Sequence, residues 1–158
     1  DVKVVRVQPS TPAMVGESDT TLCPDVLVTP VQMDDILAIL NSFGKTEILP
    51  EHLMDAVPAI ASSAPAYAFM LIEAMADGGV LHGFPRDQAI RLAAQAVYGS
   101  AKMVLESGKH PAELKDMVCT PGGTTIEAVR ALENGGFRKT VIDAVDACAK
   151  KSKSMMEK

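Results

Sequence analysis

The 158-residue sequence contains no tryptophan, and aromatic residues make up only 4% of it. A core without large rings must be filled by small or flexible side chains, and nine methionines are among those available. Such side chains let helices approach closely, so the composition favours a helical fold. The length fits one compact domain or a domain with an appendage.

An excess of positive charge is also missing. The sequence has 15 Lys and Arg against 20 Asp and Glu, a formal net charge of −5 and no long basic run. Since phosphate backbones are bound by basic surfaces, this balance argues against nucleic acid as the main partner.

No uninterrupted apolar run is long enough to span a bilayer comfortably. The most apolar stretch, residues 56–72, carries no charge but contains two prolines and two serines. We interpret it as a buried helix and expect no membrane partner.

Cysteine is scarce as well. The three cysteines are Cys23, Cys119 and Cys148. They lie far apart and their odd number leaves one over in any pairing, so we expect reduced thiols in a cytoplasmic protein.

The three histidines show no metal-ligand spacing, and we predict no metal site.

Residues 1–50 carry the strand-like part of the sequence. The predicted strands are residues 2–7, 20–22 and 45–49. A capping box of Thr29 and Gln32 predicts a helix that runs to Ser42, with Gly44 ending it in a left-handed conformation. Because a strand needs neighbours, we interpret this part as the remnant of a larger sheet.

From residue 51 onward the sequence has helical period almost throughout. The predicted helices are residues 51–61, 65–75, 86–107, 111–118, 124–133 and 138–155. A turn is predicted at residues 77–79. Apolar residues surround the second of these helices on nearly every face, which is typical of a central helix. The fold class predicted is mainly α, a helical bundle with a short β segment at its N-terminus.

The most informative motif is the segment 118–126, Val-Cys-Thr-Pro-Gly-Gly-Thr-Thr-Ile. Two glycines and two threonines at the head of a helix present free backbone N–H groups and hydroxyls at the positive end of the helix dipole. This pattern is typical of a site for a carboxylate or phosphate. The alternative is an ordinary turn with Thr124 as N-cap.

Two further candidates have simple structural alternatives. Cys119 could act as a nucleophile, but no activating His or Asp accompanies it, so a structural thiol is favoured. Glu73 and Asp77 are spaced as an acid–base pair on one helix face, and a solvated or salt-bridged face is favoured. Arg86 is a candidate salt-bridge partner.

A set of motifs then carries a resemblance to a known family. In order, they are Asp55-Ala56-Val57, Pro65-Ala66-Tyr67, residues 73–78, Gly83-Phe84-Pro85-Arg86, Ala101-Lys102-Met103, His110-Pro111, Leu114-Lys115-Asp116, residues 121–126 and Gly136-Phe137-Arg138. Their order and spacing resemble those of the pyrroline-5-carboxylate reductase family. The chain is similar to the helical C-terminal domain of that family, with the end of the preceding Rossmann-type domain. Residues 114–132 are the most specific part.

The resemblance implies two domains. Residues 1–50 would be the remnant of the dinucleotide-binding domain, and residues 51–158 the helical dimerisation and substrate-binding domain. Members of the family use NADPH or NADH to reduce Δ1-pyrroline-5-carboxylate to L-proline, the last step of proline biosynthesis. They form homodimers with swapped helical domains, often assembled into larger rings.

The resemblance also implies which residues form the site. The substrate-binding residues would be Val118, Thr120, Gly122, Gly123, Thr124 and Thr125. Thr125 would have the catalytic role, near the ring nitrogen. The nicotinamide cofactor would touch Pro9, Ser10 and Thr11 and be held mainly by the Rossmann part, whose glycine-rich fingerprint is absent from this sequence.

Three positions depart from the family pattern. Ser10 stands where the family has Asn, and Ser62 and Ala64 stand where it has glycine. The leading hypothesis is the C-terminal part of such an oxidoreductase, inactive alone without the cofactor domain. The alternatives are a stand-alone helical dimerisation protein without catalysis, and the helical domain of a related hydroxy-acid or amino-acid dehydrogenase.

Overall fold

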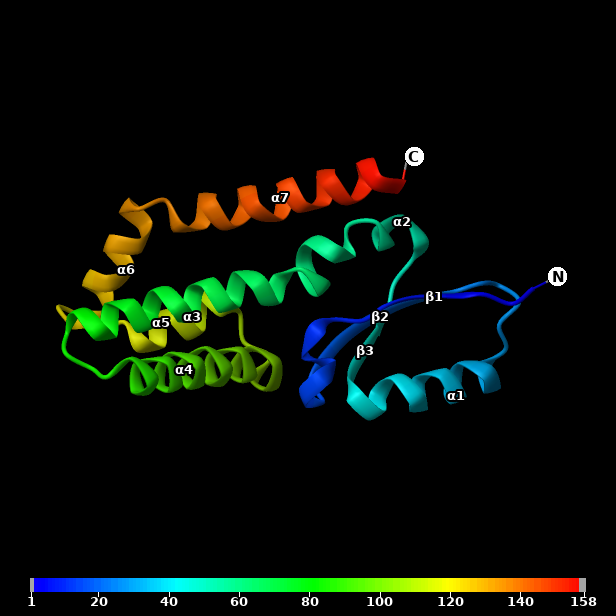
Figure 1. Ribbon diagram of the computed structural model, residues 1–158, viewed down its shortest axis with the longest axis horizontal. Helices are drawn as coiled ribbons and strands as arrows, with labels where there is room; N and C mark the ends of the chain where they lie inside the picture. The colour runs from blue at the N-terminus through cyan, green and yellow to red at the C-terminus, as the bar shows by residue number, and fades with distance from the viewer. Residues whose placement is uncertain (1, 157–158) are drawn as a thin grey trace. The chain divides into compact units, whose positions relative to one another are not determined.

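A computed structural model describes residues 2–156, and helices dominate this part of the chain (Figure 1). The mainly α fold class predicted from the sequence is confirmed. The chain divides into two compact units. The first contains the chain up to Tyr67 together with the segment from Asp143 onward, and the second spans Ala68–Ile142.

The first unit contains a three-stranded sheet in the order β1-β2-β3. Its strands are β1 (Val5–Gln8), β2 (Ser18–Pro24) and β3 (Gly44–Ile48). β1 runs antiparallel to β2, and β3 runs parallel to β2. The predicted strands therefore exist with different bounds. The first begins at Val5 rather than at residue 2, the second extends beyond residues 20–22 at both ends, and the third is shifted by one residue.

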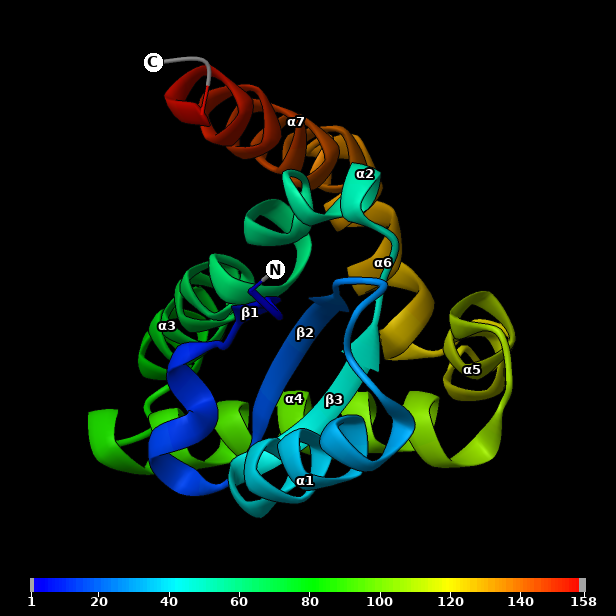
Figure 2. The same cartoon turned by 90° about the vertical axis from the view of Figure 1, so that its right-hand side faces the viewer.

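Helix α1 (Pro30–Leu40) connects β2 to β3 and lies beside the sheet (Figure 2). The predicted capping box is confirmed, because Gln32 N donates to Thr29 Oγ1 at 3.4 Å and Thr29 N donates to Gln32 Oε1 at 3.1 Å. The helix ends earlier than predicted, in a 3₁₀ turn at Asn41–Phe43.

Gly44 was expected to end this helix in a left-handed conformation, and that prediction is wrong. Its φ of 162° and ψ of −147° are extended, and it is the first residue of β3. A Cβ at this position would lie 2.2 Å from the carbonyl oxygen of Ser18. Glycine is needed here because β3 approaches β2 so closely.

The helix predicted over residues 51–61 is interrupted. The structure has a single turn, α2 (Glu51–Met54), followed by a π-helical turn at Pro58–Ser62. Proline has no N–H to donate and disturbs the helix that precedes it, which explains the break. Ser63 N donates to Pro58 O at 2.8 Å and closes the π turn. This segment covers the sheet, because Met54, Val57 and Ala61 pack with Cys23 and Leu49.

The remaining helices are α3 (Ala64–Leu81), α4 (Arg86–Ser107), α5 (Pro111–Val118), α6 (Thr124–Asn134) and α7 (Phe137–Met156). The bounds predicted for α4 and α5 are confirmed, and those for α6 and α7 are right to within one residue. The turn predicted at residues 77–79 is wrong, because α3 continues to Leu81. Gly79 lies close to α4, and a Cβ there would be 3.1 Å from Ala89 Cβ.

Helix α3 was interpreted as buried, and within this chain it is not. Phe69 is 61% exposed and Met70 69%, and Ala76 is the buried residue of the helix. The stretch Pro58–Leu81 is long and apolar enough to cross a membrane by length and composition alone. The chain itself has too few neighbouring elements to cover so many apolar side chains.

Candidate functional site

The loop between α5 and α6 is the candidate anion site, and it lies within the second unit. Helix α5 begins at a cap formed by His110, whose Nδ1 accepts from Ala112 N at 3.2 Å. After α5 ends, Gly123 N donates to Thr120 O at 3.0 Å and closes a tight turn. Gly122 has a φ of +68°, which glycine adopts without strain.

Gly123 is the N-cap residue of α6, and no side chain caps this helix. The alternative in which Thr124 acts as N-cap is therefore wrong, because Thr124 is the first residue of the helix. The first N–H groups of an α-helix have no acceptor within the helix, and the helix dipole adds partial positive charge there. The start of α6 is therefore suited to a small anion such as a carboxylate.

Thr120 lies directly against Gly123. A Cβ added to Gly123 would be 2.3 Å from Thr120 Oγ1, so a larger residue would require Thr120 to shift. Val118, Thr120, Gly122 and Thr124 are exposed, while Thr125 is half-buried. The loop thus places the predicted substrate-binding residues together on one accessible turn of the chain.

The predicted cofactor residues follow β1 in the first unit. Pro9 and Thr11 are exposed, whereas Ser10 is buried. Ser10 Oγ accepts from Asp19 N at 2.9 Å, and Ser10 N donates to Ser18 Oγ at 3.3 Å. The Ser10 side chain is therefore used to fix the loop to β2.

Gln8, the last residue of β1, also forms a contact that the sequence did not indicate. Its Nε2 donates to Ser62 Oγ at 3.2 Å. No motif marked Gln8, and the two departures from glycine, at Ser62 and Ala64, were the signals in the sequence that this segment is unusual.

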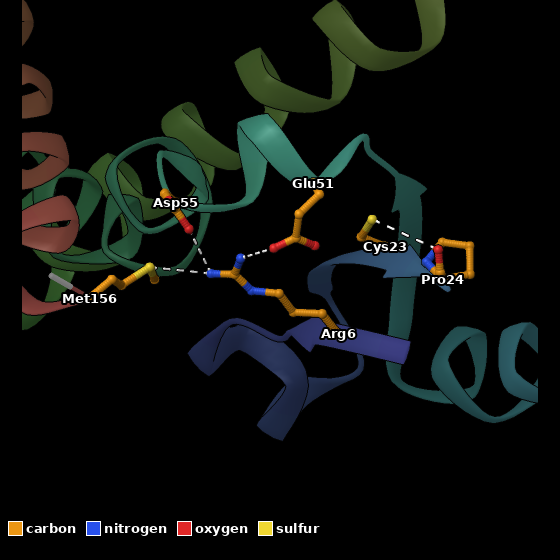
Figure 3. A network of polar contacts seen from close by, with 6 residues as sticks. All are labelled: Arg6, Cys23, Pro24, Glu51, Asp55 and Met156. Atoms are coloured by element: carbon orange, nitrogen blue, oxygen red, sulfur yellow. Dashed lines mark hydrogen bonds and ion pairs between the residues drawn. The ribbon is translucent and has the colours of Figure 1, made fainter. Parts of the chain in front are cut away.

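A charged cluster lies at the opposite end of β1 (Figure 3). The guanidinium of Arg6 donates to Glu51, to Asp55 at 2.9 Å and to the sulfur of Met156 at 3.5 Å. The hydrogen bond to Asp55, and to a smaller extent the one to Glu51, raises the pKa of the Arg6 guanidinium. Burial raises the pKa of the nearby Cys23 thiol. This cluster joins β1 to α2 and to the end of α7, so we assign it a structural role.

The other sequence candidates lie outside the α5–α6 loop or show no activating partner. Arg86 forms an ion pair with Asp77, as the salt-bridge alternative predicts. Cys119 is a free, half-buried thiol. Within residues 2–156, no group of three or more His, Cys, Asp or Glu side chains is arranged to hold a metal ion.

These observations define a class of protein: a mainly helical chain with a small three-stranded sheet and a helix N-terminus open to a small anion. A family model described as pyrroline-5-carboxylate reductase dimerisation matches residues 51–155. The chain belongs to this family.

Curated relatives agree with this assignment. The chain is 54% identical over 155 residues to the pyrroline-5-carboxylate reductase of Escherichia coli strain K12, and the match covers 98% of this chain and 58% of that protein. It is 44% identical over 158 residues to the enzyme of the same name from Synechocystis, covering all of this chain and 59% of the relative. The chain thus spans less than two thirds of the length of these relatives.

Solved structures show the same fold. The Plasmodium falciparum pyrroline carboxylate reductase with NADP bound matches with a TM-score of 0.90 and 36% identity, over 98% of this chain and 62% of that one. A pyrroline-5-carboxylate reductase from Coxiella burnetii matches with a TM-score of 0.90 and 31% identity, over 96% of this chain and 57% of the other.

Proposed function

We propose that this chain is the substrate-binding and dimerisation part of a pyrroline-5-carboxylate reductase, which reduces Δ1-pyrroline-5-carboxylate to L-proline with NADPH or NADH. The observation that carries the proposal is the uncapped N-terminus of α6 behind Gly122 and Gly123. The names of the relatives support the reaction, and none of them supports a stand-alone dimerisation protein.

The substrate carboxylate would bind the open N–H groups at the start of α6. Exposed Thr120 and Thr124 would add hydroxyl donors, and the glycines allow the anion to approach the backbone closely. The anion is thereby held by fixed dipoles that need no rearrangement when it binds.

Thr125 would orient the ring. As the second residue of α6 it lies within the same turn, and its hydroxyl would hydrogen-bond near the ring nitrogen. A protonated cyclic imine is already electrophilic at its imine carbon, so the protein has to align this carbon and exclude water rather than supply a strong acid or nucleophile. Hydride addition at the imine carbon would move the C=N electrons to nitrogen and give proline.

The nicotinamide cofactor, when bound, would supply that hydride. Within this chain, exposed Pro9 and Thr11 would contact it on a loop that Ser10 fixes to β2. These residues fit a supporting contact to a nicotinamide ring. They do not form the glycine-rich turn that binds a dinucleotide pyrophosphate, so most of the cofactor binding lies outside this chain.

Homo-oligomerisation is supported by the description of the family model. We further propose a domain boundary between residues 50 and 51, because the family match begins at residue 51. We also propose that two copies swap their helical domains and that such dimers assemble into larger rings. The apolar side chains exposed on α3 would be covered by the second copy. The free thiols fit a cytoplasmic location.

The proposal is tested by assaying the complete gene product with Δ1-pyrroline-5-carboxylate and NADPH or NADH. We expect oxidation of the cofactor with formation of L-proline. The Thr125→Val variant should lower kcat/KM by about tenfold to a hundredfold, since it loses a hydrogen bond to a charged group, while Thr125→Ser should stay within a few-fold of wild type. A wild-type protein that oxidises neither cofactor would overturn the proposal.

A further inference from the structure

The loop Pro9–Thr11 is held from its inner side by a chain of buried hydroxyls. Ser10, Ser18 and Thr20 are each at least nine-tenths buried. Ser18 Oγ lies 2.8 Å from Thr20 Oγ1 and 3.5 Å from Ser10 Oγ, and Ser10 Oγ accepts from Asp19 N. These bonds attach the middle of the loop to β2 alone.

Gln8 attaches the start of the same loop to a different element. Its backbone pairs with Thr21 in the sheet, but its side-chain amide reaches Ser62, 54 residues away in sequence, at 3.2 Å. Both side chains are half-buried, so water competes only partly for this bond.

Ser62 is the last residue of the π turn and lies two positions before the start of α3. The neighbouring Ser63 faces another element, because its hydroxyl accepts from Cys148 of α7 at 3.5 Å.

We infer that the hydrogen bond from Gln8 to Ser62 is a positioning contact that fixes the loop Pro9–Thr11 to the π turn before α3 and so keeps the loop in its cofactor-binding conformation. The inference rests on the proposed function, which gives this loop its contact with the nicotinamide. Gln8 and Ser62 are positioning residues, because they act through the loop.

Loss of the bond should affect cofactor binding and leave turnover nearly unchanged. Without it, the loop samples several conformations, and only one of them binds the cofactor. The apparent Kd of the cofactor then rises by the inverse of the fraction of protein in that conformation. The net contribution of one such bond corresponds to about a three- to tenfold rise. At saturating cofactor the loop is held in place by the ligand, so kcat should stay within twofold of wild type.

The test uses the complete gene product and five variants. Gln8→Leu and Ser62→Ala each remove one partner, and a double variant carries both changes. Ser62→Thr keeps the hydroxyl, and Ser63→Ala is the matched control on the adjacent residue. KM for NADPH, KM for Δ1-pyrroline-5-carboxylate and kcat are measured, with NADPH binding by fluorescence titration as a readout independent of turnover.

We expect the first two variants to raise KM and Kd for NADPH by about three- to tenfold, with the KM for the pyrroline and kcat within twofold. The double variant should be no worse than either single one, because both remove the same bond. Ser62→Thr and Ser63→Ala should behave as wild type.

Three results would overturn the inference: unchanged NADPH binding in Gln8→Leu and Ser62→Ala, additive effects in the double variant, or an equal loss in Ser63→Ala. Failure of the proposed function is a distinct outcome, since it would appear as an inactive wild-type protein. The two single variants probe the same bond, so either one that folds gives the measurement.

Discussion

At the scale of single residues, the α5–α6 loop was the part of the site that the sequence described best. Gly122 and Gly123 have the roles that adjacent glycines at a helix start suggest, one with a positive φ and the other packed against a hydroxyl. The identity of that hydroxyl, Thr120, could not be predicted, because it depends on how the turn folds back on itself.

For Gly44 and Ser10, the structure shows contacts that the sequence pattern did not indicate. Gly44 was assigned to a helix end from its position after an apolar face, but its need for glycine comes from the backbone of Ser18, 26 residues earlier. Ser10 was predicted to contact the cofactor, and the structure adds that its hydroxyl accepts from Asp19 N of β2. Both contacts join two different elements, and local sequence patterns do not reveal such contacts.

At the scale of elements, the capping box correctly predicted the start of α1, whereas the glycine pair at residues 78–79 wrongly predicted a turn. Helix α1 begins where Thr29 caps it. Helix α3 passes through Gly78 and Gly79 because a glycine on that face lets α4 approach. A glycine pair therefore reports either a turn or a close helix contact, and the sequence alone does not separate the two.

This difference between the two glycines gives a prediction. Gly79→Ala places a methyl group 3.1 Å from Ala89 Cβ, so it should lower the free energy of unfolding by about 1 kcal/mol despite the better helix propensity of alanine. Gly78→Ala is the matched control, with no atom within 4 Å of the added group, and should raise stability by about 0.5–1 kcal/mol. Urea unfolding of the purified proteins measures both.

Equal effects of the two variants would contradict the close contact between α3 and α4. A stabilising Gly79→Ala would do the same, because it would mean that the helices have room for the methyl group.

At the scale of the whole molecule, a single copy of the chain leaves many apolar side chains of its helices exposed to solvent. Phe69 and Met70 of α3 and Leu105 of α4 are each more than half exposed. The apolar pattern of α3 predicted a helix covered on nearly every face, and the residues of this chain do not provide that cover. The pattern does not say which elements would provide it.

We therefore expect the protein to associate at micromolar concentration. Light scattering of the complete gene product should give a mass of at least two copies, because burying these side chains removes a large apolar surface from water. A monomer that stays folded and monodisperse at that concentration would be inconsistent with a shared helical interface.

The most direct test of the central claim is hydrogen exchange at the start of α6 in the complete gene product with NADP⁺. The amides of Thr124, Thr125 and Ile126 have no acceptor within the helix and should exchange fast in the free protein. We predict that saturating L-proline slows their exchange several-fold and that pyrrolidine, which lacks the carboxylate, does not. Unchanged exchange with L-proline, or equal protection by pyrrolidine, would contradict carboxylate binding at this helix.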